Sequence, residues 1–163
     1  MQRLEYLALI APDSEALKDC QAKLLETKKQ VVHLQTSLAE QIVKQNEVPP
    51  DAYQGKDREA LIKLIADKWA KDGTKAKILK AGIIGTDWTR KVAWEVQNQT
   101  LSKIDRSRIQ GYVLVENDKT TVVRHSINLT QDHLTNDVLT ASFLNDPKQE
   151  VELSDRILKS KLK

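Results

Sequence analysis

The first third of the chain carries the hydrophobic pattern of one long helix. No Gly or Pro occurs from Asp13 to Glu47, and Asp13 or Ser14 can cap the free amides of the first turn. Apolar residues recur with alternating spacings of three and four, which is the a/d pattern of a coiled-coil seam. The seam positions are Leu17, Cys20, Leu24, Thr27, Val31, Leu34 and Leu38. Thr27 and the following Gln41 weaken the seam, because both are polar.

Two interpretations of this helix are open. About 33 residues at a rise of ~1.5 Å give a rod of ~50 Å, longer than the ~30 Å width of a small domain. In one, the helix lies across the concave face of a sheet, which suits the wider apolar face around Leu38, Ile42 and Val43. In the other, its N-terminal half pairs with a second helix in a homodimer or a larger assembly. Both hold if they apply to different parts of the rod, and Cys20 is then a small buried hydrophobe.

A second, shorter helix follows the proline pair at 49–50, which ends the first one. It is predicted to begin near Lys56 or Asp57 and to stop at Gly73. Its apolar face contains Leu61, Ile62, Leu64, Ile65, Lys68 and Trp69. Trp69 is expected to be a core anchor beneath a sheet.

From residue 74 the pattern changes to that of strands. Runs rich in Val, Ile, Thr and aromatic residues are separated by short polar breaks, and such short connections imply antiparallel neighbours. The runs are 75–84, 88–97, 108–116 and 120–129. The sequence ENDK at 116–119 is the clearest hairpin turn. Gly82 and Gly85 indicate a bend or bulge before the second run.

The C-terminal part is less regular. Residues 130–145 fit either a helix capped by Thr130 or a fifth strand from Val138 to Leu144, and the alternation in LTASF favours the strand. Pro147 ends this segment. The tail QEVELSDRILKSKLK predicts a short helix from Ser154, with its apolar residues on one side and basic residues at its end.

Helices followed by an antiparallel meander of four to five strands define an α+β domain. We expect residues 1–48 to form the long helix, partly projecting or in a coiled coil, 49–146 to form the globular domain, and 147–163 to form a helical tail. The order of elements resembles that of cystatin-like and NTF2-like folds, in which a long helix is wrapped by a curved sheet. This resemblance is architectural, and fold alone implies no function.

Composition narrows the class of protein. With 163 residues, 40% of them hydrophobic, and a net charge of +3, the sequence indicates a soluble, mildly basic protein with one domain. Cys20 is the single cysteine, which excludes an internal disulfide and a Cys-based zinc site. The apolar run from Leu7 to Ala11 is too short for a signal-peptide core or a membrane span. We therefore expect a cytoplasmic protein; removal of a leader before residue 1 would instead make it an exported mature chain.

Positive charge is concentrated in one segment. Residues 71–108 contain 9 Lys and Arg against 4 Asp and Glu, whereas both flanking segments are close to neutral. In the simplest interpretation these cations lie on the exposed faces and edges of strands. In the alternative they form a surface that binds anions or nucleic acid. The residues of this candidate anion surface are Lys75, Lys77, Lys80, Lys91, Arg106 and Arg108.

One face of the run 88–97 mixes aromatic, aliphatic and charged side chains, because side chains alternate along a strand. That face contains Trp88, Arg90, Val92, Trp94 and Val96. Since the tryptophans lie with the valines, the face is predicted to be packed, and Arg90 does not fit it. Either a bulge after Gly85 turns Arg90 to the surface, or Arg90 lies at the rim of a pocket and pairs with an acid such as Asp87.

The sequence contains no common catalytic motif. His33, His125 and His133 stand in no metal-binding spacing, and P-loop, GxGxxG and GxSxG patterns are absent, so we expect no metal and no cofactor. His125 alternates with apolar residues, which makes it either a hydrogen-bonded core residue or, with Asp87 or Tyr112, the acid–base group of a pocket. The residues of this candidate pocket are His125, Arg90, Trp94 and Tyr112.

These observations favour a non-enzymatic protein–protein interaction or assembly protein, whose long N-terminal helix mediates self-association or docking in a complex. The interaction residues of that helix are Leu17, Cys20, Leu24, Val31, Leu34 and Leu38. The first alternative is an NTF2-like small-molecule-binding protein or enzyme with a pocket near His125. The second is an anion or nucleic-acid binder that uses residues 71–108.

Overall fold

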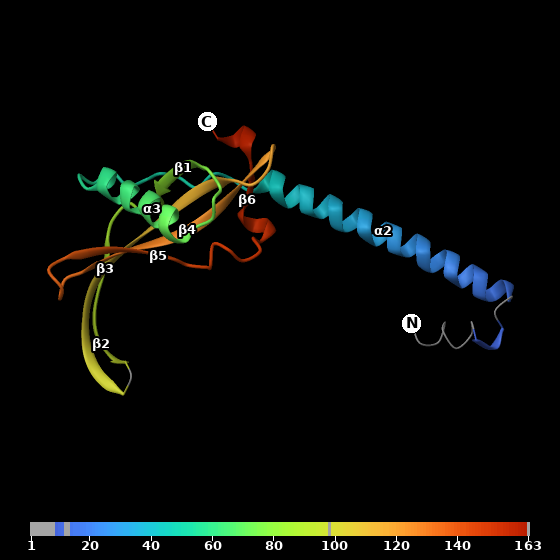
Figure 1. Ribbon diagram of the computed structural model, residues 1–163, viewed down its shortest axis with the longest axis horizontal. Coiled ribbons are helices and arrows are strands. Elements are labelled where there is room, and N and C mark those ends of the chain that lie inside the picture. The colour runs from blue at the N-terminus through green and yellow to red at the C-terminus, as the bar shows by residue number, and fades with distance from the viewer. Residues whose placement is uncertain (1–8, 12–13, 98, 163) are drawn as a thin grey trace. The chain divides into compact units, whose positions relative to one another are not determined.

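The computed structural model describes residues 9–11, 14–97 and 99–162. Two helices precede a six-stranded antiparallel sheet, so the predicted α+β class is confirmed (Figure 1). The chain divides into two compact units, residues 1–42 and 43–163. Helix α2 provides most of the described part of the first unit, and the second unit contains α3 and the whole sheet.

Helix α2, Glu15–Gln45, matches the long helix that the sequence predicts. Backbone amides of its first turn donate to the carbonyl of Ser14. The polar Thr27 in the seam donates its hydroxyl to the carbonyl of Lys23 at 2.8 Å. Its hydroxyl is therefore satisfied inside the helix and does not need a partner elsewhere.

Helix α3, Arg58–Asp72, packs on the sheet, as predicted for the second helix. Its buried residues are Leu61, Ile65 and Trp69. These residues are four apart and therefore share one side of the helix. The Nε1–H of Trp69 donates to the carbonyl of Ala76 at 3.0 Å, which ties the helix to the chain that leads into the sheet. The prediction that Trp69 is a core anchor is confirmed.

The sheet is built around one long central strand, β3. The strands are β1, Ile78–Ile83; β2, Thr89–Gln97; β3, Thr100–Glu116; β4, Thr121–Asp132; β5, Val138–Phe143; and β6, Arg156–Leu158. Strands β1 and β2 pair with one side of β3 and β4 with the other, while β5 and β6 pair with the far side of β4. The predicted fifth strand and the hairpin turn after Glu116 are confirmed.

The two faces of the sheet are covered by different parts of the chain. On one face α3 packs on a cluster that includes Ile109, Val113 and Ile127. A Cβ at Gly111 would lie 2.7 Å from Cδ1 of Ile65, so α3 approaches too closely for a larger residue there. One interpretation of the sequence placed the long helix across the concave face of the sheet, but the helix that packs on this face is α3.

The opposite face of the sheet holds a second cluster of buried residues. Its members are Tyr112, Leu114, Val122 and Ile157, with Val48, Ile84 and Leu162 against them. The predicted tail helix from Ser154 is wrong, because Ile157 is carried by the short strand β6 between two 3₁₀ turns. The Asn46 amide donates to the carbonyls of Leu153 and Arg156, at 2.8 Å each. These bonds and the pairing with β4 override the local helical pattern.

Strand β2 and the first half of β3 form a hairpin that curves away from the part of the sheet under α3 (Figure 1). The register of the two strands is continuous over all of β2. The register shift of the sheet lies between Ile78 and Lys80, so no bulge occurs at Gly82 or Gly85, whereas the predicted bend before the second run is present at 86–87. Gly82 has another role, because a Cβ there would lie 2.6 Å from the ring of Tyr112.

Candidate functional site

The coiled-coil seam of α2 is exposed over most of its length. Val31, Leu34 and Leu38 are 47%, 61% and 57% exposed. Leu24 is half-buried and Leu17 is buried, so the exposed part of the seam begins at Cys20, whose thiol is free. The apolar side chains of this helix are therefore available to a further helix.

Charged side chains lie mainly on the opposite side of α2. At about 100° per residue, the side away from the seam carries both signs of charge. The residues on that side are Lys18, Asp19, Glu26, Lys29 and Glu40. Thr27 and Gln41 are polar residues within the seam, and Lys28 and Gln35 are polar residues that flank it. The helix is thus amphipathic, with a charged face suited to water and an apolar face that the described residues leave largely exposed.

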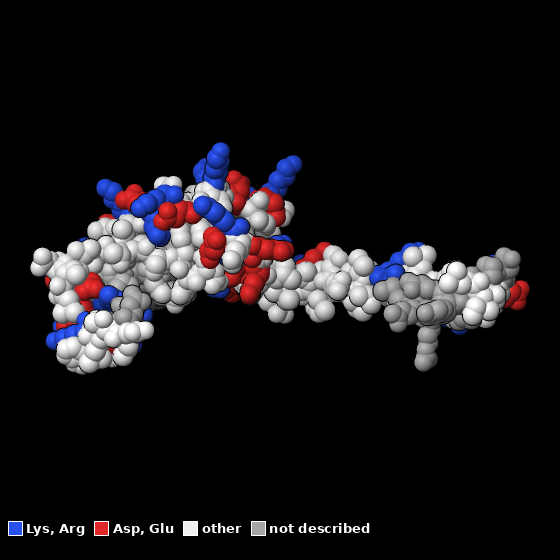
Figure 2. All heavy atoms as spheres, turned by 60° about the horizontal axis from the view of Figure 1, so that its bottom comes forward, with Lys and Arg blue, Asp and Glu red and all other residues white. Residues whose placement is uncertain are grey.

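The β2–β3 hairpin carries a second exposed apolar surface, which we call the hairpin patch. It consists of Val92, Trp94, Val96 and Leu101, all between 57% and 72% exposed and all on one face. Figure 2 shows the end of the hairpin, at the lower left, as a largely uncharged surface. The prediction that this face is packed is wrong for Trp94, because the cluster under α3 reaches Ile109 of β3 and does not include the hairpin patch. Trp88 is half-buried against that cluster.

Arg90 and Asp105 form a two-pronged ion pair at the root of the hairpin. Nε and a terminal nitrogen of Arg90 donate to the two carboxylate oxygens of Asp105, at 2.7 Å each. These bonds hold the pKa of Asp105 below its usual value, although burial of the carboxyl opposes them. Arg90 is exposed without a bulge, and its partner is Asp105 instead of the predicted Asp87.

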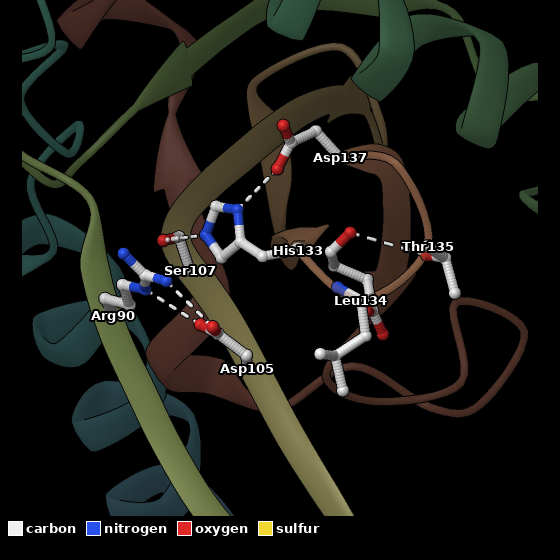
Figure 3. Close-up of polar contacts among 8 residues, drawn as sticks. Arg90, Asp105, Ser107, His133, Leu134, Thr135 and Asp137 are labelled. Carbon is white, nitrogen blue, oxygen red and sulfur yellow. Dashed lines mark hydrogen bonds and ion pairs between the residues drawn. The ribbon is translucent and has the colours of Figure 1, made fainter.

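A chain of hydrogen bonds next to this pair joins a serine, a histidine and an aspartate (Figure 3). Ser107 Oγ lies 2.7 Å from His133 Nε2, and His133 Nδ1 lies 2.5 Å from a carboxylate oxygen of Asp137. Because a carboxylate only accepts, Nδ1 carries the proton, and in the neutral ring Nε2 accepts from the Ser107 hydroxyl. No sequence pattern indicates this group, since Ser107 and His133 are 26 residues apart and only the register of β3 against β4 brings them together.

The environment of Ser107 does not support nucleophilic catalysis. Ser107 is 6% exposed and lies in the middle of β3, which is paired on both sides. Acyl transfer needs a substrate carbonyl beside the hydroxyl and free backbone donors for the developing oxyanion. The ladders of β3 engage the neighbouring backbone, and five principal clefts of the described chain are lined by residues other than Ser107 and His133. The chain of bonds therefore acts as an anchor for the turn between β4 and β5.

This anchor fixes the base of the hairpin from three directions. Asp132 accepts from Nε of Arg106 at 2.8 Å on one face of β3, while His133 bonds to Ser107 on the other. The backbone amide of His133 also donates to the carbonyl of Asp105 at 2.9 Å. Ion pairs and hydrogen bonds thus fix β3 at the point where it enters the exposed hairpin.

His125 lies on the face of the sheet that α3 covers. It is half-buried against Trp69, and burial lowers the pKa of its imidazole while the charge of Asp155 partly opposes that shift. A cleft of about 220 Å³ lies beside it. Its acidic members are Asp146, Glu150, Glu152 and Asp155. The cleft is smaller than the ~300–1,000 Å³ of most small-molecule sites.

The candidate pocket around His125 is not assembled. Tyr112 is fully buried on the opposite face of the sheet, where its hydroxyl donates to the carbonyl of Pro49 at 3.1 Å. Arg90 and Trp94 lie on the hairpin and do not line the cleft beside His125. The four residues of the candidate pocket therefore lie on the face covered by α3, on the opposite face of the sheet and on the hairpin.

The candidate anion surface is partly neutralised. Lys91, Arg106 and Arg108 lie on the face of the hairpin opposite the hairpin patch. Arg106 pairs with Asp132 at 2.8 Å, and Lys91 pairs with Glu95 at 2.7 Å. The remaining members are Lys75 and Lys77, which are exposed before β1, and Lys80, which is half-buried on β1.

No family model, no curated protein and no solved structure matches this chain. Among the residues that the structure describes, no group of three or more His, Cys, Asp and Glu side chains is placed to hold a metal ion. None of the described helices combines the length and the apolar composition that crossing a bilayer requires.

Proposed function

We propose that this chain is a non-enzymatic assembly protein that self-associates through α2, which forms a parallel, in-register coiled coil with α2 of a second copy. The observation that carries the proposal is the exposure of Val31, Leu34 and Leu38 along one seam of a continuous helix.

An exposed helix of this kind gains stability from a partner. Helices in water owe most of their stability to packing of an apolar face, because nucleation is costly and each added residue contributes little. Full burial of one large aliphatic side chain contributes about 1.5–3 kcal/mol. Pairing covers several such side chains at once, whereas the charged side of α2 stays in water.

The distribution of polar residues along the seam favours the parallel orientation. In a parallel, in-register pair each seam residue meets its own counterpart, so Thr27 meets Thr27 and Gln41 meets Gln41. Each leucine and valine of the seam then meets an apolar residue. In an antiparallel pair a positions meet d positions, which sets Thr27 and Gln41 against aliphatic side chains and buries the Gln41 amide without a polar partner.

A second copy of the chain fits this seam without any further assumption. Closed two-fold dimers are the most common oligomers, and the seam is self-complementary when it is in register. Such a dimer would bring two α+β units into one assembly, where they can serve as the part that other components recognise.

The test compares two leucines of α2 that are equally exposed. Leu34 is a seam residue and 61% exposed, whereas Leu25 lies one position away from the seam and is 57% exposed. Sedimentation equilibrium of the full chain should show self-association. Leu34→Lys should shift it toward the monomer by at least tenfold in dissociation constant, because it places two cations in the seam. Leu25→Lys should leave the dimer in place.

Two results would contradict the proposal. One is a monomer at every concentration up to the solubility limit of the intact chain. The other is a dimer that Leu34→Lys and Leu25→Lys weaken equally, which would show that exposed hydrophobic surface in general drives association. Circular dichroism of both variants establishes that α2 and the sheet are still formed.

A further inference from the structure

The outer edge of β2 is unpaired among the described strands, and charged side chains such as Lys91 are its main protection. Strand β2 pairs with β3 along one side, and no strand of the described chain pairs with its other side. Its nine residues, TRKVAWEVQ, contain no proline, and their register shows no bulge. Natural edge strands of this length usually carry such devices, because free N–H and C=O groups recruit another strand.

The backbone groups that face outward from β2 follow from the bonds of β3. The carbonyl of Asp105 accepts from the amide of His133 on the β4 side, so Asp105 directs its backbone groups away from β2. Val92, which stands opposite Asp105, is therefore in a non-hydrogen-bonded pair and directs its own N–H and C=O outward. By alternation the same holds for Arg90, Trp94 and Val96.

The sequence of β2 is complementary to itself when read backward around Ala93. In an antiparallel pair of two β2 strands centred on Ala93, Lys91 stands opposite Glu95 of the second copy, and Glu95 opposite its Lys91. On the other face, Val92 stands opposite Trp94 of the second copy. This register uses the outward backbone groups of Val92 and Trp94 for hydrogen bonds, as the geometry of β2 requires.

We propose that β2 pairs antiparallel with β2 of a second copy, with the two-fold axis at Ala93, so that the sheets of two copies become one continuous sheet. The contact joins the hairpin patches of both copies and places opposite charges across the interface on the other face. It is separate from the α2 coiled coil, since it uses a different surface in the other compact unit of the chain.

The structure presents β2 in a form ready for this pairing. Arg90 is clamped by Asp105, and Ser107 is bonded to His133, so the root of the hairpin is fixed before any partner arrives. A fixed strand loses less conformational freedom on pairing than a loose one. The outer edge of β1 is less accessible, because Asp51 and Ala52 bond to the backbone of Ile83 there.

Disulfide cross-linking tests the register directly. In the full chain with Cys20→Ser, Ala93→Cys would place two thiols across the axis in a non-hydrogen-bonded pair, with Cα atoms ~4.5 Å apart, within the range of a disulfide. Thr89→Cys is the matched control on the same face, where the two thiols would be about 26 Å apart. Under mild oxidation Ala93→Cys should form the covalent dimer at least tenfold faster than Thr89→Cys. Equal rates, or no dimer from Ala93→Cys, would overturn the proposal.

A charge swap gives a second test that does not depend on the thiols. It is made in the Leu34→Lys background, so that pairing of α2 and pairing of β2 are measured separately. Lys91→Glu and Glu95→Lys each turn two attractive cross-strand pairs into repulsive ones, and each should weaken self-association about tenfold. An equimolar mixture of the two variants restores both attractive pairs and should associate as tightly as the parent.

Loss of the internal Lys91 and Glu95 pair alone cannot produce this pattern, because each chain in the mixture still lacks it. If the mixture associates no better than the separate variants, β2 is not the interface. A monomeric Leu34→Lys parent would also overturn β2 pairing while leaving the coiled coil of α2 intact. If Lys91→Glu and Glu95→Lys each associate as tightly as the Leu34→Lys parent, the contact is made by a different surface. That result would also refute the proposed register.

Discussion

The imidazole of His125 packs against the indole of Trp69, with ring centroids 4.9 Å apart and planes inclined by 42°. The contact joins β4 to α3 and places a titratable ring beside the principal core cluster. His125 is thus half-buried on the face that α3 covers, in contact with a buried residue of the core. Its protonation should therefore affect folding more than any chemistry.

The first prediction concerns the pH dependence of stability. Burial lowers the pKa of His125 in the folded chain, so the unfolded chain binds the proton more readily. The stabilising contribution is complete above the ordinary histidine pKa of about 6.5 and is lost as pH falls toward the lower folded value. Denaturant melts of the intact chain should show stability falling between about pH 7.5 and 5.5, and His125→Phe should reduce that slope while keeping the ring contact with Trp69.

His33 provides the control for this experiment, since it is exposed on α2 and far from Trp69 in sequence. His33→Gln should leave the pH dependence unchanged. An unchanged slope in His125→Phe would refute the assignment.

The second prediction concerns the unequal burial of two tryptophans. Trp69 is 3% exposed and also donates to Ala76, whereas Trp94 is 65% exposed. Trp69→Ala should lower the free energy of unfolding by about 3–5 kcal/mol. Trp94→Ala should change it by no more than about 0.5 kcal/mol in dilute solution, where self-association does not contribute. Equilibrium unfolding in urea measures both, and a large loss for Trp94→Ala would show that the hairpin patch is packed within the chain.

Alternation along a strand predicts the face on which a side chain lies, but it does not predict whether that face is buried. Pleating correctly places Trp94 on the same face as Val92 and Val96. Burial of that face depends on a cover, and α3, with 15 residues, is about 22 Å long and lies over another part of the sheet. The sequence of β2 contains no information on how far α3 extends over the sheet. For the same reason the sequence could not show that Arg90 and Trp94 lie on the hairpin, away from His125.

The long helix and the tail illustrate the other limits of prediction. Helix α2 was predictable because its pattern is long, periodic and free of Gly and Pro. The tail was not, because three residues around Ile157 take the conformation of a strand through pairing with β4. The Ser107 and His133 contact depends on the register of β3 against β4, which short-range patterns do not contain.

The third prediction addresses the hydrogen-bonded Ser107, His133 and Asp137. If Ser107 were a nucleophile, a fluorophosphonate would react with its Oγ and release fluoride, as it does with serine hydrolases. The buried position of Ser107 and the engaged backbone around it predict no labelling under conditions that label chymotrypsin. Mass spectrometry of the treated chain checks this. Labelling that disappears in Ser107→Ala would overturn the anchoring role.

The fourth prediction uses Cys20 to determine the orientation of the α2 pair. Cys20 is a seam residue and its thiol is free and exposed. In a parallel, in-register coiled coil the two Cys20 residues face each other at a distance that a disulfide can bridge. Mild oxidation of the wild-type chain should therefore give a covalent dimer, which non-reducing electrophoresis detects. A dimer by sedimentation that yields no disulfide would indicate an antiparallel pair or a staggered register.

The fifth prediction uses a like-charge contact that the parallel pair creates. In heptad terms Lys23 occupies a g position and Lys28 the following e position, and these two positions approach each other across a parallel coiled coil. The wild-type dimer therefore contains two Lys–Lys contacts, which cost some affinity. Lys28→Glu converts both into opposite-charge contacts and should tighten the dimer by about two- to tenfold at low salt, given ~0.2–1 kcal/mol for each exposed pair.

Lys29→Glu, on the charged side of the helix, is the matched control and should leave affinity unchanged. Because the gain is electrostatic, it should shrink as ionic strength rises. A weaker dimer for Lys28→Glu, or an equal effect of the control, would contradict the parallel arrangement.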